Sequence, residues 1–315
     1  MAPVLPRAEG RRTASADPAP AVLVVGDVMT DIICRPEGPL ILGSDRRAEI
    51  RARPGGSGAN QAVWLASFGA RVRFAGRVGA ADRDALAAHF AGLGVEAVLG
   101  ADPLRPSGAI VTIVSPDGER SFLTDRGANA FLSAGDLPPA LLADVGLLVV
   151  SGYALFEPGP RAAVSALMAA ARQAGIGIAV DPASVGFLEE VGPGNFLDWT
   201  EGATMIFAND AEALALTGET DAEAQLAALL GRYSRAAVKR GGLGAVFGSR
   251  DGERCLRSAP QVDVVDSTGA GDAFAAAFIA AELGGAAAAT ALERAVAAGS
   301  AAVRQIGGRP PVTAG

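Results

Sequence analysis

Short apolar runs that alternate with helix-length segments constrain the fold of this chain more than any other feature. Runs that predict buried strands occur at residues 21–25, 72–75, 145–151, 177–180, 205–208 and 236–239, and most of them are followed by a helical pattern. Strands joined in this way form right-handed βαβ units. The sequence therefore predicts an α/β fold, with a central, mostly parallel sheet between two layers of helices. Half of the residues are hydrophobic but only 5% are aromatic, which suits an aliphatic core of this kind.

Two segments with alternating polarity, residues 32–53 and 109–124, do not fit the parallel sheet. In the second, the turn Ser115-Pro116-Asp117-Gly118 separates two strand-like stretches and predicts a hairpin. We expect these segments to form a small separate β-layer within one domain that covers residues 21–315. Residues 1–20 are rich in Pro, Ala and Arg, and we expect them to be a disordered tail.

Charge and hydropathy exclude several classes of protein. The net charge of −7 and a pI of about 4.9 argue against general nucleic-acid binding. Neither a signal peptide nor an apolar run long enough for a membrane span is recognisable, so we expect a cytoplasmic protein. His89 is the only histidine, which excludes a histidine metal cluster, and a helix surface is its expected place. Lys239 is the only lysine.

Polar segments follow the predicted strands at the points where the strands end. They are residues 26–31, 55–60, 181, 209–212, 239–244 and 266–272. Because ligands of such sheets bind at the carboxyl ends of the strands, we expect these segments to converge on one crevice.

The segment Asp266-Ser267-Thr268-Gly269-Ala270-Gly271-Asp272 precedes a long Ala-rich helix that we expect to begin at Asp272. Small residues there let backbone N–H groups approach an anion, and the helix dipole favours negative charge. A carboxylate at the same place would repel a phosphate, unless it serves to take a proton from an attacking hydroxyl. A capped helix start is the alternative explanation.

A second glycine-rich segment, Pro54-Gly55-Gly56-Ser57-Gly58-Ala59-Asn60, precedes a helix expected from Gln61. Its bare backbone would let a ligand lie close, and Asn60 offers both a donor and an acceptor to a hydroxyl. A flexible loop is the alternative. The spacing matches neither the P-loop of nucleotide-binding proteins nor the dinucleotide-binding fingerprint.

Taken together and in this order, the two glycine segments resemble the two signature patterns of the ribokinase (PfkB) family. The first continues at the family's spacing with Ala62, Gly69 and Gly79, and the resemblance covers Val22 to Pro311. It implies a ribokinase-like three-layer α/β/α fold with a β-sheet lid, made here by the two alternating segments. It also implies an ATP- and Mg²⁺-dependent kinase of small molecules, with a lid that excludes water and often mediates a homodimer.

The resemblance assigns roles to individual residues. Asp272 becomes the general base, and the backbone amides of Gly269, Ala270, Gly271 and Asp272 form an anion hole. Asn209 and Glu212 match an NxxE pattern that organises Mg²⁺, in the case of Glu212 through water, although a helix cap is the alternative. Asp266 matches an acid that helps to bind K⁺ in several members. The nucleotide contacts are Lys239, Gly241, Gly242, Gly244 and Thr268. For Lys239 the alternative is a solitary surface lysine.

On the acceptor side the implied contacts to substrate are Asp27, Asp31, Gly56, Ser57, Asn60, Arg126 and Asn129. Met29 stands where ribose-specific members have Asn, which speaks against ribose. Ser57 stands where members that act on sugar phosphates often have Lys, which favours a free hydroxyl compound. The stretch after Gly79 also lacks the family's second glycine. The expected activity is phosphorylation of a primary hydroxyl of a sugar or sugar acid. The alternatives are a nucleoside kinase, acting on pseudouridine, adenosine or inosine, and a non-catalytic sensor of sugars or nucleotides.

Overall fold

The computed structural model of the chain describes residues 19–115 and 120–311. Within them a nine-stranded sheet has the order β13-β12-β11-β10-β9-β8-β1-β4-β5. Seven neighbouring strands run parallel to one another: β11, β10, β9, β8, β1, β4 and β5. β12 runs antiparallel to β11, and β13 runs antiparallel to β12. The bounds are β1 Ala21–Val25, β4 Val72–Gly79, β5 Val95–Asp102, β8 Val145–Ser151, β9 Gly177–Asp181, β10 Met205–Asn209, β11 Arg235–Lys239, β12 Ala245–Ser249 and β13 Arg254–Arg257.

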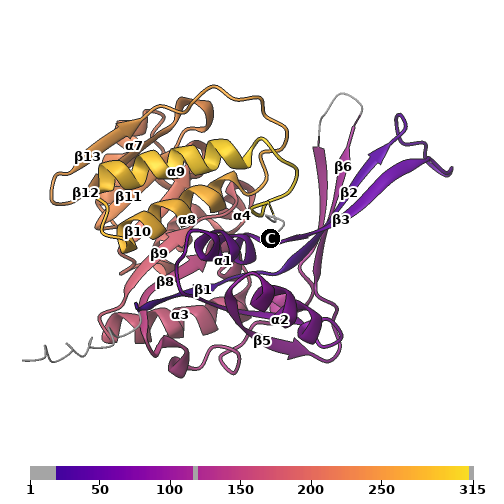
Figure 1. Cartoon of the computed structure of the whole chain (residues 1–315), viewed down its shortest axis with the longest axis horizontal. Coiled ribbons are helices and arrows are strands. Elements are labelled where there is room, and N and C mark those ends of the chain that lie inside the picture. The colour runs from indigo at the N-terminus through magenta and orange to yellow at the C-terminus, as the bar shows by residue number, and fades with distance from the viewer. Residues whose placement is uncertain (1–18, 116–119, 312–315) are drawn as a thin grey trace, which may run out of the picture.

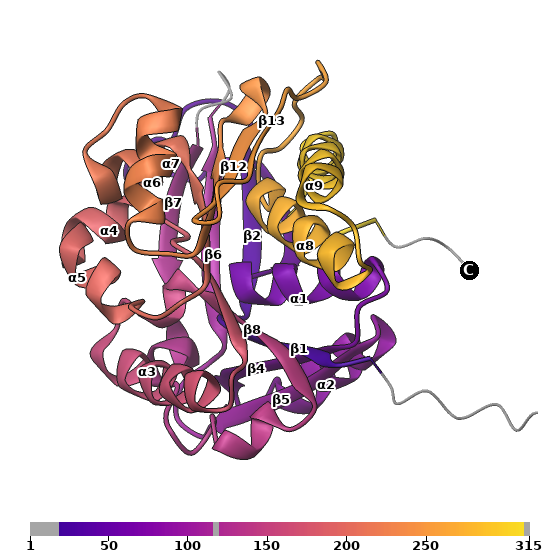
Figure 2. The same cartoon turned by 90° about the vertical axis from the view of Figure 1, so that its left-hand side faces the viewer.

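Helices cover both faces of this sheet, as Figure 2 shows when the sheet is viewed along its edge. One apolar core joins the sheet to α3 (Pro158–Gln173), α4 (Val185–Val191), α5 (Pro193–Trp199), α6 (Asp210–Thr217) and α7 (Ala222–Leu230). A second core joins the other face to α1 (Ser57–Ser67), α2 (Arg83–Gly92), α8 (Ala270–Leu283) and α9 (Ala288–Ala302). The predicted three-layer α/β/α architecture is confirmed.

A separate four-stranded sheet, with the order β3-β2-β6-β7, projects from the body of the molecule (Figure 1). Its strands are β2 (Met29–Pro36), β3 (Ala48–Gly55), β6 (Gly108–Val114) and β7 (Arg120–Asp125). The expected small β-layer therefore exists, and we call it the lid sheet. The tip of the predicted hairpin between β6 and β7 lies outside the described residues, as do all but the last two residues of the predicted N-terminal tail.

Both helices next to the glycine segments begin earlier than the sequence predicts. α1 begins at Ser57, four residues before the predicted Gln61, so most of the first glycine segment is helix and not loop. Gly56, with a φ of +92°, turns the chain into this helix, and a Cβ on it would lie 2.6 Å from the Asp27 carbonyl oxygen. α8 begins at Ala270 after Gly269, which has a φ of +74°.

Several elements carry no clear pattern in the sequence: β5, β13, α4, α5 and α7. β5 and β13 lie at the two edges of the central sheet, where half-exposed strands lose the continuous apolar run that marks a buried strand. Within the described residues, no helix is both long and apolar enough to cross a membrane.

Candidate active site

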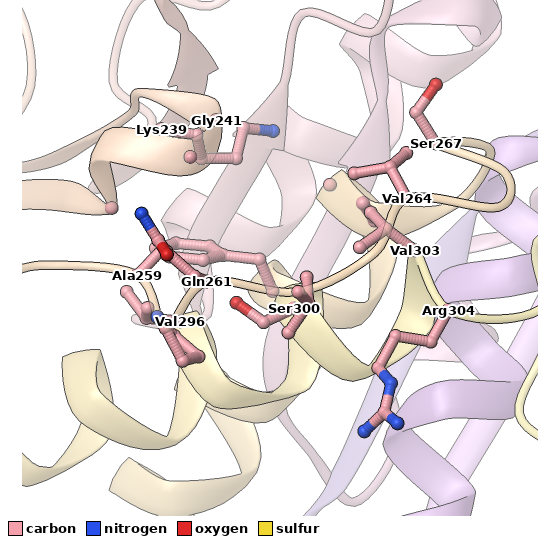
Figure 3. Close-up of a pocket in the computed structure, with 18 of the residues that line it drawn as sticks. Lys239, Gly241, Ala259, Gln261, Val264, Ser267, Val296, Ser300, Val303 and Arg304 are labelled. Carbon is pink, nitrogen blue, oxygen red and sulfur yellow. The ribbon is translucent and has the colours of Figure 1, made fainter.

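Two adjoining cavities lie at the carboxyl ends of the central strands and share Asn209, Lys239 and Gly271. The smaller, of about 290 Å³, lies between the central sheet and the lid sheet, which contributes Ile110 and Thr124. The larger, of about 1100 Å³, lies between α8, α9, the end of β11 with the loop after it, and residues 259–264 (Figure 3). All six polar segments that we expected to converge on one crevice contribute residues to one cavity or the other.

Asp272 lies in the first turn of α8, at the wall of the smaller cavity. Its carboxylate accepts hydrogen bonds from Ser57 Oγ (2.8 Å), Asn60 Nδ2 (3.2 Å) and Gln61 Nε2 (3.2 Å), all from α1. Burial, with a smaller contribution from Asp181, raises the pKa of Asp272 to about 7, even though these three donors act to lower it. A carboxyl group with such a pKa can both take up and release a proton near neutral pH.

No side chain among the described residues caps the N-terminus of α8, so within this part of the chain its first backbone N–H groups lack the partners that a helix start usually receives from a side chain. Gly269 and Gly271 both line the smaller cavity there. A Cβ on Gly269 would lie 2.4 Å from Gly308, and one on Gly271 would lie 3.1 Å from Lys239 Nζ. Bare backbone at the start of a helix, beside a lysine, is a suitable environment for a phosphate.

Lys239 is the centre of a charged cluster between the two cavities. Its Nζ donates to Asp181 Oδ2 at 2.9 Å. Burial acts to lower the pKa of Lys239, but the carboxylates of Asp181 and Glu212 outweigh it and the pKa is raised. Burial raises the pKa of Glu212 to about 7, and Lys239 opposes that shift. Asn209 and Glu212 form a capping box at the start of α6, with both hydrogen bonds at 2.8 Å.

The acid side chains predicted to bind an acceptor line the smaller cavity. Asp27 Oδ1 accepts from the Gly58 N–H at 3.1 Å, and its Oδ2 lies 3.9 Å from Arg126 Nη1. Asp31 Oδ1 is buried without a hydrogen-bond partner in the described structure. Burial and then the neighbouring Asp27 raise the pKa of Asp31 to about 6. A buried carboxylate oxygen without a partner can accept a hydrogen bond from a ligand.

Other predicted residues are distributed as follows. Gly56, Ser57, Asn60, Arg126 and Thr268 line the smaller cavity, and Gly241, Gly242 and Gly244 line the larger. Asn129 lines neither: its amide is paired with the backbone N–H and carbonyl of Val28, each at 2.9 Å. Asp266 accepts from the N–H groups of Thr268 (2.9 Å) and Gly307 (3.0 Å), and so connects the α8 loop to the C-terminal segment.

Residues of the site that were not assigned a role from the sequence include Gln61, Tyr153, Phe187 and Arg309. Gln61 directly follows Asn60, and its place could have been inferred had α1 been expected to begin earlier. Tyr153 and Phe187 line the smaller cavity, with ring centroids 5.8 Å apart. Arg309 donates to Asn60 and to the Gly55 carbonyl, from a position 249 residues later in the chain than Asn60. No local pattern signals such a contact.

No group of three or more His, Cys, Asp or Glu side chains in the described ranges has the arrangement of a metal site. Mg²⁺ usually keeps several of its waters and is bound by one or two carboxylates together with phosphates. Asn209 and Glu212, at the border of the two cavities, are the residues that could hold it.

The sequence and the fold both resemble those of known proteins. A family model described as pfkB family carbohydrate kinase matches residues 19–314. The bifunctional protein HldE of Caulobacter vibrioides is 32% identical, over 96% of this chain and 62% of its own length. The chain thus spans less than two thirds of that relative.

Solved structures of similar proteins share the fold. Adenosine kinase from Sinorhizobium meliloti superposes with a TM-score of 0.82 at 26% identity, over 94% of this chain and 97% of its own. An Escherichia coli protein assigned as a ribokinase II, solved with ATP and Mg²⁺, gives a TM-score of 0.82 at 25% identity, over 92% and 94% of the two chains.

Proposed function

This chain belongs to the pfkB family of carbohydrate kinases, and on that premise we propose that it transfers the γ-phosphoryl group of ATP to a hydroxyl of a free sugar or sugar acid. One observation carries the proposal above all others. Asp272, with a pKa raised to about 7, lies where the two cavities meet and in the first turn of an uncapped helix. A proton acceptor and a phosphate-binding helix start are thus within one turn of each other.

We assign the larger cavity to ATP. Its volume of about 1100 Å³ slightly exceeds the range typical of small-molecule sites, roughly 300–1,000 Å³. Its walls combine apolar side chains such as Val264 and Val296 with the bare backbone of Gly241 and Gly242. Lys239 lies at its junction with the smaller cavity, where a cation would neutralise phosphate charge. Mg²⁺, when bound near Asn209 and Glu212, supplies further neutralisation of the phosphates.

In this assignment the acceptor hydroxyl lies in the smaller cavity beside Asp272. The carboxylate takes the hydroxyl proton as the oxygen attacks the γ-phosphorus, while the bond from that phosphorus to the β,γ-bridging oxygen breaks and ADP leaves. The N–H groups at the start of α8 stabilise the charge on the phosphoryl oxygens. The lid sheet excludes water, which prevents loss of ATP by hydrolysis. Arg126 is held by Asp27 and by the Tyr153 carbonyl, to which it donates at 2.9 Å, and it borders the acceptor.

The side chains of the smaller cavity favour a polyhydroxyl acceptor. Asp27 and Asp31 together offer carboxylate oxygens, which can accept hydrogen bonds from neighbouring hydroxyls. Ser57, which donates to Asp272, occupies the place where a lysine would attract a phosphorylated substrate. An acceptor without a phosphate group therefore fits best.

A nucleoside is the second candidate acceptor, and one observation favours it. The rings of Tyr153 and Phe187 form an aromatic wall of the smaller cavity, against which a base could stack. Phe156 extends this wall behind them, with its ring centroid 5.1 Å from that of Phe187.

The test is ADP release, measured with a coupled assay and Mg²⁺–ATP, against a panel of free pentoses, hexoses, sugar acids and nucleosides. Activity with a sugar supports the first proposal, and activity only with nucleosides supports the second. ATP binding without ADP release for any acceptor would contradict both, and would favour a sensor on the same fold.

Two further properties remain proposals. We propose that K⁺ raises the activity, since Asp266 joins the α8 loop to the segment around Gly307; the assay with and without K⁺ tests this. We also propose a homodimer formed through the lid sheet. The sheet exposes Ile50, Phe122 and Leu123 by 60% or more each, and sedimentation analysis would show the oligomeric state.

A further inference from the structure

The C-terminal segment Gly307–Arg309 passes behind both glycine segments. The Gly307 N–H donates to Asp266, and the Gly308 carbonyl accepts from Trp64 Nε1 at 2.9 Å. A Cβ on Gly308 would lie 2.4 Å from Asn60 Nδ2, so only glycine allows this approach. The backbone therefore brings the next residue, Arg309, against the start of α1.

The guanidinium of Arg309 has three polar neighbours from different parts of the chain. Its Nε donates to Asn60 Oδ1 at 3.3 Å, and its Nη2 donates to the Gly55 carbonyl at 3.3 Å. Its Nη1 lies 3.0 Å from His89 Nε2. Burial lowers the pKa of Arg309 to about 10, and the nearby Asp31 opposes that shift. Arg309 therefore keeps its charge at neutral pH.

This contact determines which way the amide of Asn60 points. A guanidinium has only donors, so the atom of Asn60 that faces Arg309 must be the oxygen. The amide nitrogen then faces Asp272 Oδ2, to which it donates at 3.2 Å. If the amide turned over, its oxygen would lie against the carboxylate of Asp272, where two acceptors repel each other.

We propose that Arg309 is a positioning residue for phosphoryl transfer, which orients Asp272 through the side chain of Asn60. The inference rests on the proposed function, because only that function gives Asp272 a proton to take. In the described structure Arg309 lines neither cavity, so it acts without touching nucleotide or acceptor. Its influence reaches the base through one intervening amide.

The first test needs no substrate. The side-chain amide resonances of Asn60 are followed by ¹⁵N NMR in the wild type between pH 5 and pH 9, and we expect an inflection caused by Asp272. Asp181, Glu212 and Lys239 also face Asp272, and Asp31 and His89 face Arg309. Asp272→Asn therefore serves to identify the component that Asp272 causes, since it must abolish that inflection.

In Arg309→Met we expect the amplitude of this inflection to fall by at least half, because the amide is no longer held. His89→Ala is the matched control: it removes another neighbour of Arg309 but leaves the Asn60 contact, so the inflection should persist. An inflection of wild-type amplitude in Arg309→Met would overturn the inference.

The second test is kinetic and uses the acceptor found in the ADP-release assay. We expect Arg309→Met to lower kcat about tenfold, the effect of losing one hydrogen bond to a charged group, with KM for ATP unchanged. Arg309→Lys, which keeps one donor, should recover part of the loss. His89→Ala should retain the wild-type kcat.

A double substitution separates positioning from a general structural role. If Arg309 acts through Asn60, the variant with both Asn60→Ala and Arg309→Met should be no less active than Asn60→Ala alone. Losses that multiply would refute the pathway through Asn60. If the wild type releases no ADP with any acceptor, the proposed function fails, while the amide titration still decides the role of Arg309.

Discussion

Replacing Asp272 by Asn should change how the stability of this protein depends on pH and should make it nearly inactive. The ionised carboxylate is buried, and its pKa of about 7 lies roughly three units above the value of 3.8 for a carboxyl group in water. At pH values between these two pKa values, Asp272 keeps its proton in the folded state but has lost it in the unfolded state. Protonation therefore stabilises the folded wild type at low pH, and this contribution is lost as the pH rises through 7.

The size of the effect follows from the two pKa values. Between pH 5 and pH 8 the wild type loses the part of this stabilisation that corresponds to nearly two of the three pKa units. At about 1.4 kcal/mol per pKa unit, this loss is about 3 kcal/mol. Asn carries no charge at either pH, so Asp272→Asn should not lose this contribution. Urea unfolding without ATP or Mg²⁺ should show that the variant gains about 3 kcal/mol relative to the wild type between pH 5 and pH 8.

The comparison between the two pH values isolates the ionisation. Any change in hydrogen bonding that the amide causes is present at both pH values and cancels. Asp84→Asn is the matched control, because its side chain is 95% exposed and its carboxylate remains in water in the folded state. A difference between variant and wild type that does not change with pH would refute our account of how burial shifts the pKa. Asp272→Asn should also lose at least about 10²-fold in kcat, the lower end for a general base.

Three further outcomes are expected. The kcat/KM of the wild type should rise as the pH is raised towards 7 and level off above it, because Asp272 must be deprotonated to act; a pH–rate profile measures this. Lys239→Met should lower the free energy of unfolding by about 3–5 kcal/mol in urea, since two buried carboxylates lose their cation, and should raise KM for ATP. Gly308→Ala should lower the free energy of unfolding by about 1–3 kcal/mol, because its Cβ meets the Asn60 amide, whereas Gly159→Ala, which meets no atom within 4 Å, should not.

The sequence predicted the architecture because buried parallel strands leave a strong local signal. The runs at residues 145–151 and 205–208 correspond to β8 and most of β10, with polar residues at their ends. The short helices α4 and α5 were missed because they are separated only by Gly192 and span seven residues each, too few to establish a helical period.

Residues of the candidate site could be predicted where they stand close together in the sequence and form a recognisable motif. Asp272 and its glycine loop stand together in the sequence, and Lys239 is the last residue of a strand. The amide of Asn129 was predicted to reach a substrate, but in the fold it holds the backbone of Val28. Contacts such as that of Arg309 depend on where distant segments cross, and no local spacing encodes them.

Three of the four chain segments that join the lid sheet to the body of the protein lie at the smaller cavity, and the fourth, residues 103–107 between β5 and β6, lines neither cavity. Residues 26–28 link β1 to β2, and the chain returns from β3 into α1 at Gly56. The return from β7 passes directly into Arg126. These junctions contain or adjoin Asp27, Ser57 and Arg126, three residues of the smaller cavity. A change in the tilt of the lid sheet would therefore also move residues that line the smaller cavity. A substitution in the lid sheet, far from any bound molecule, can therefore change the specificity for the acceptor.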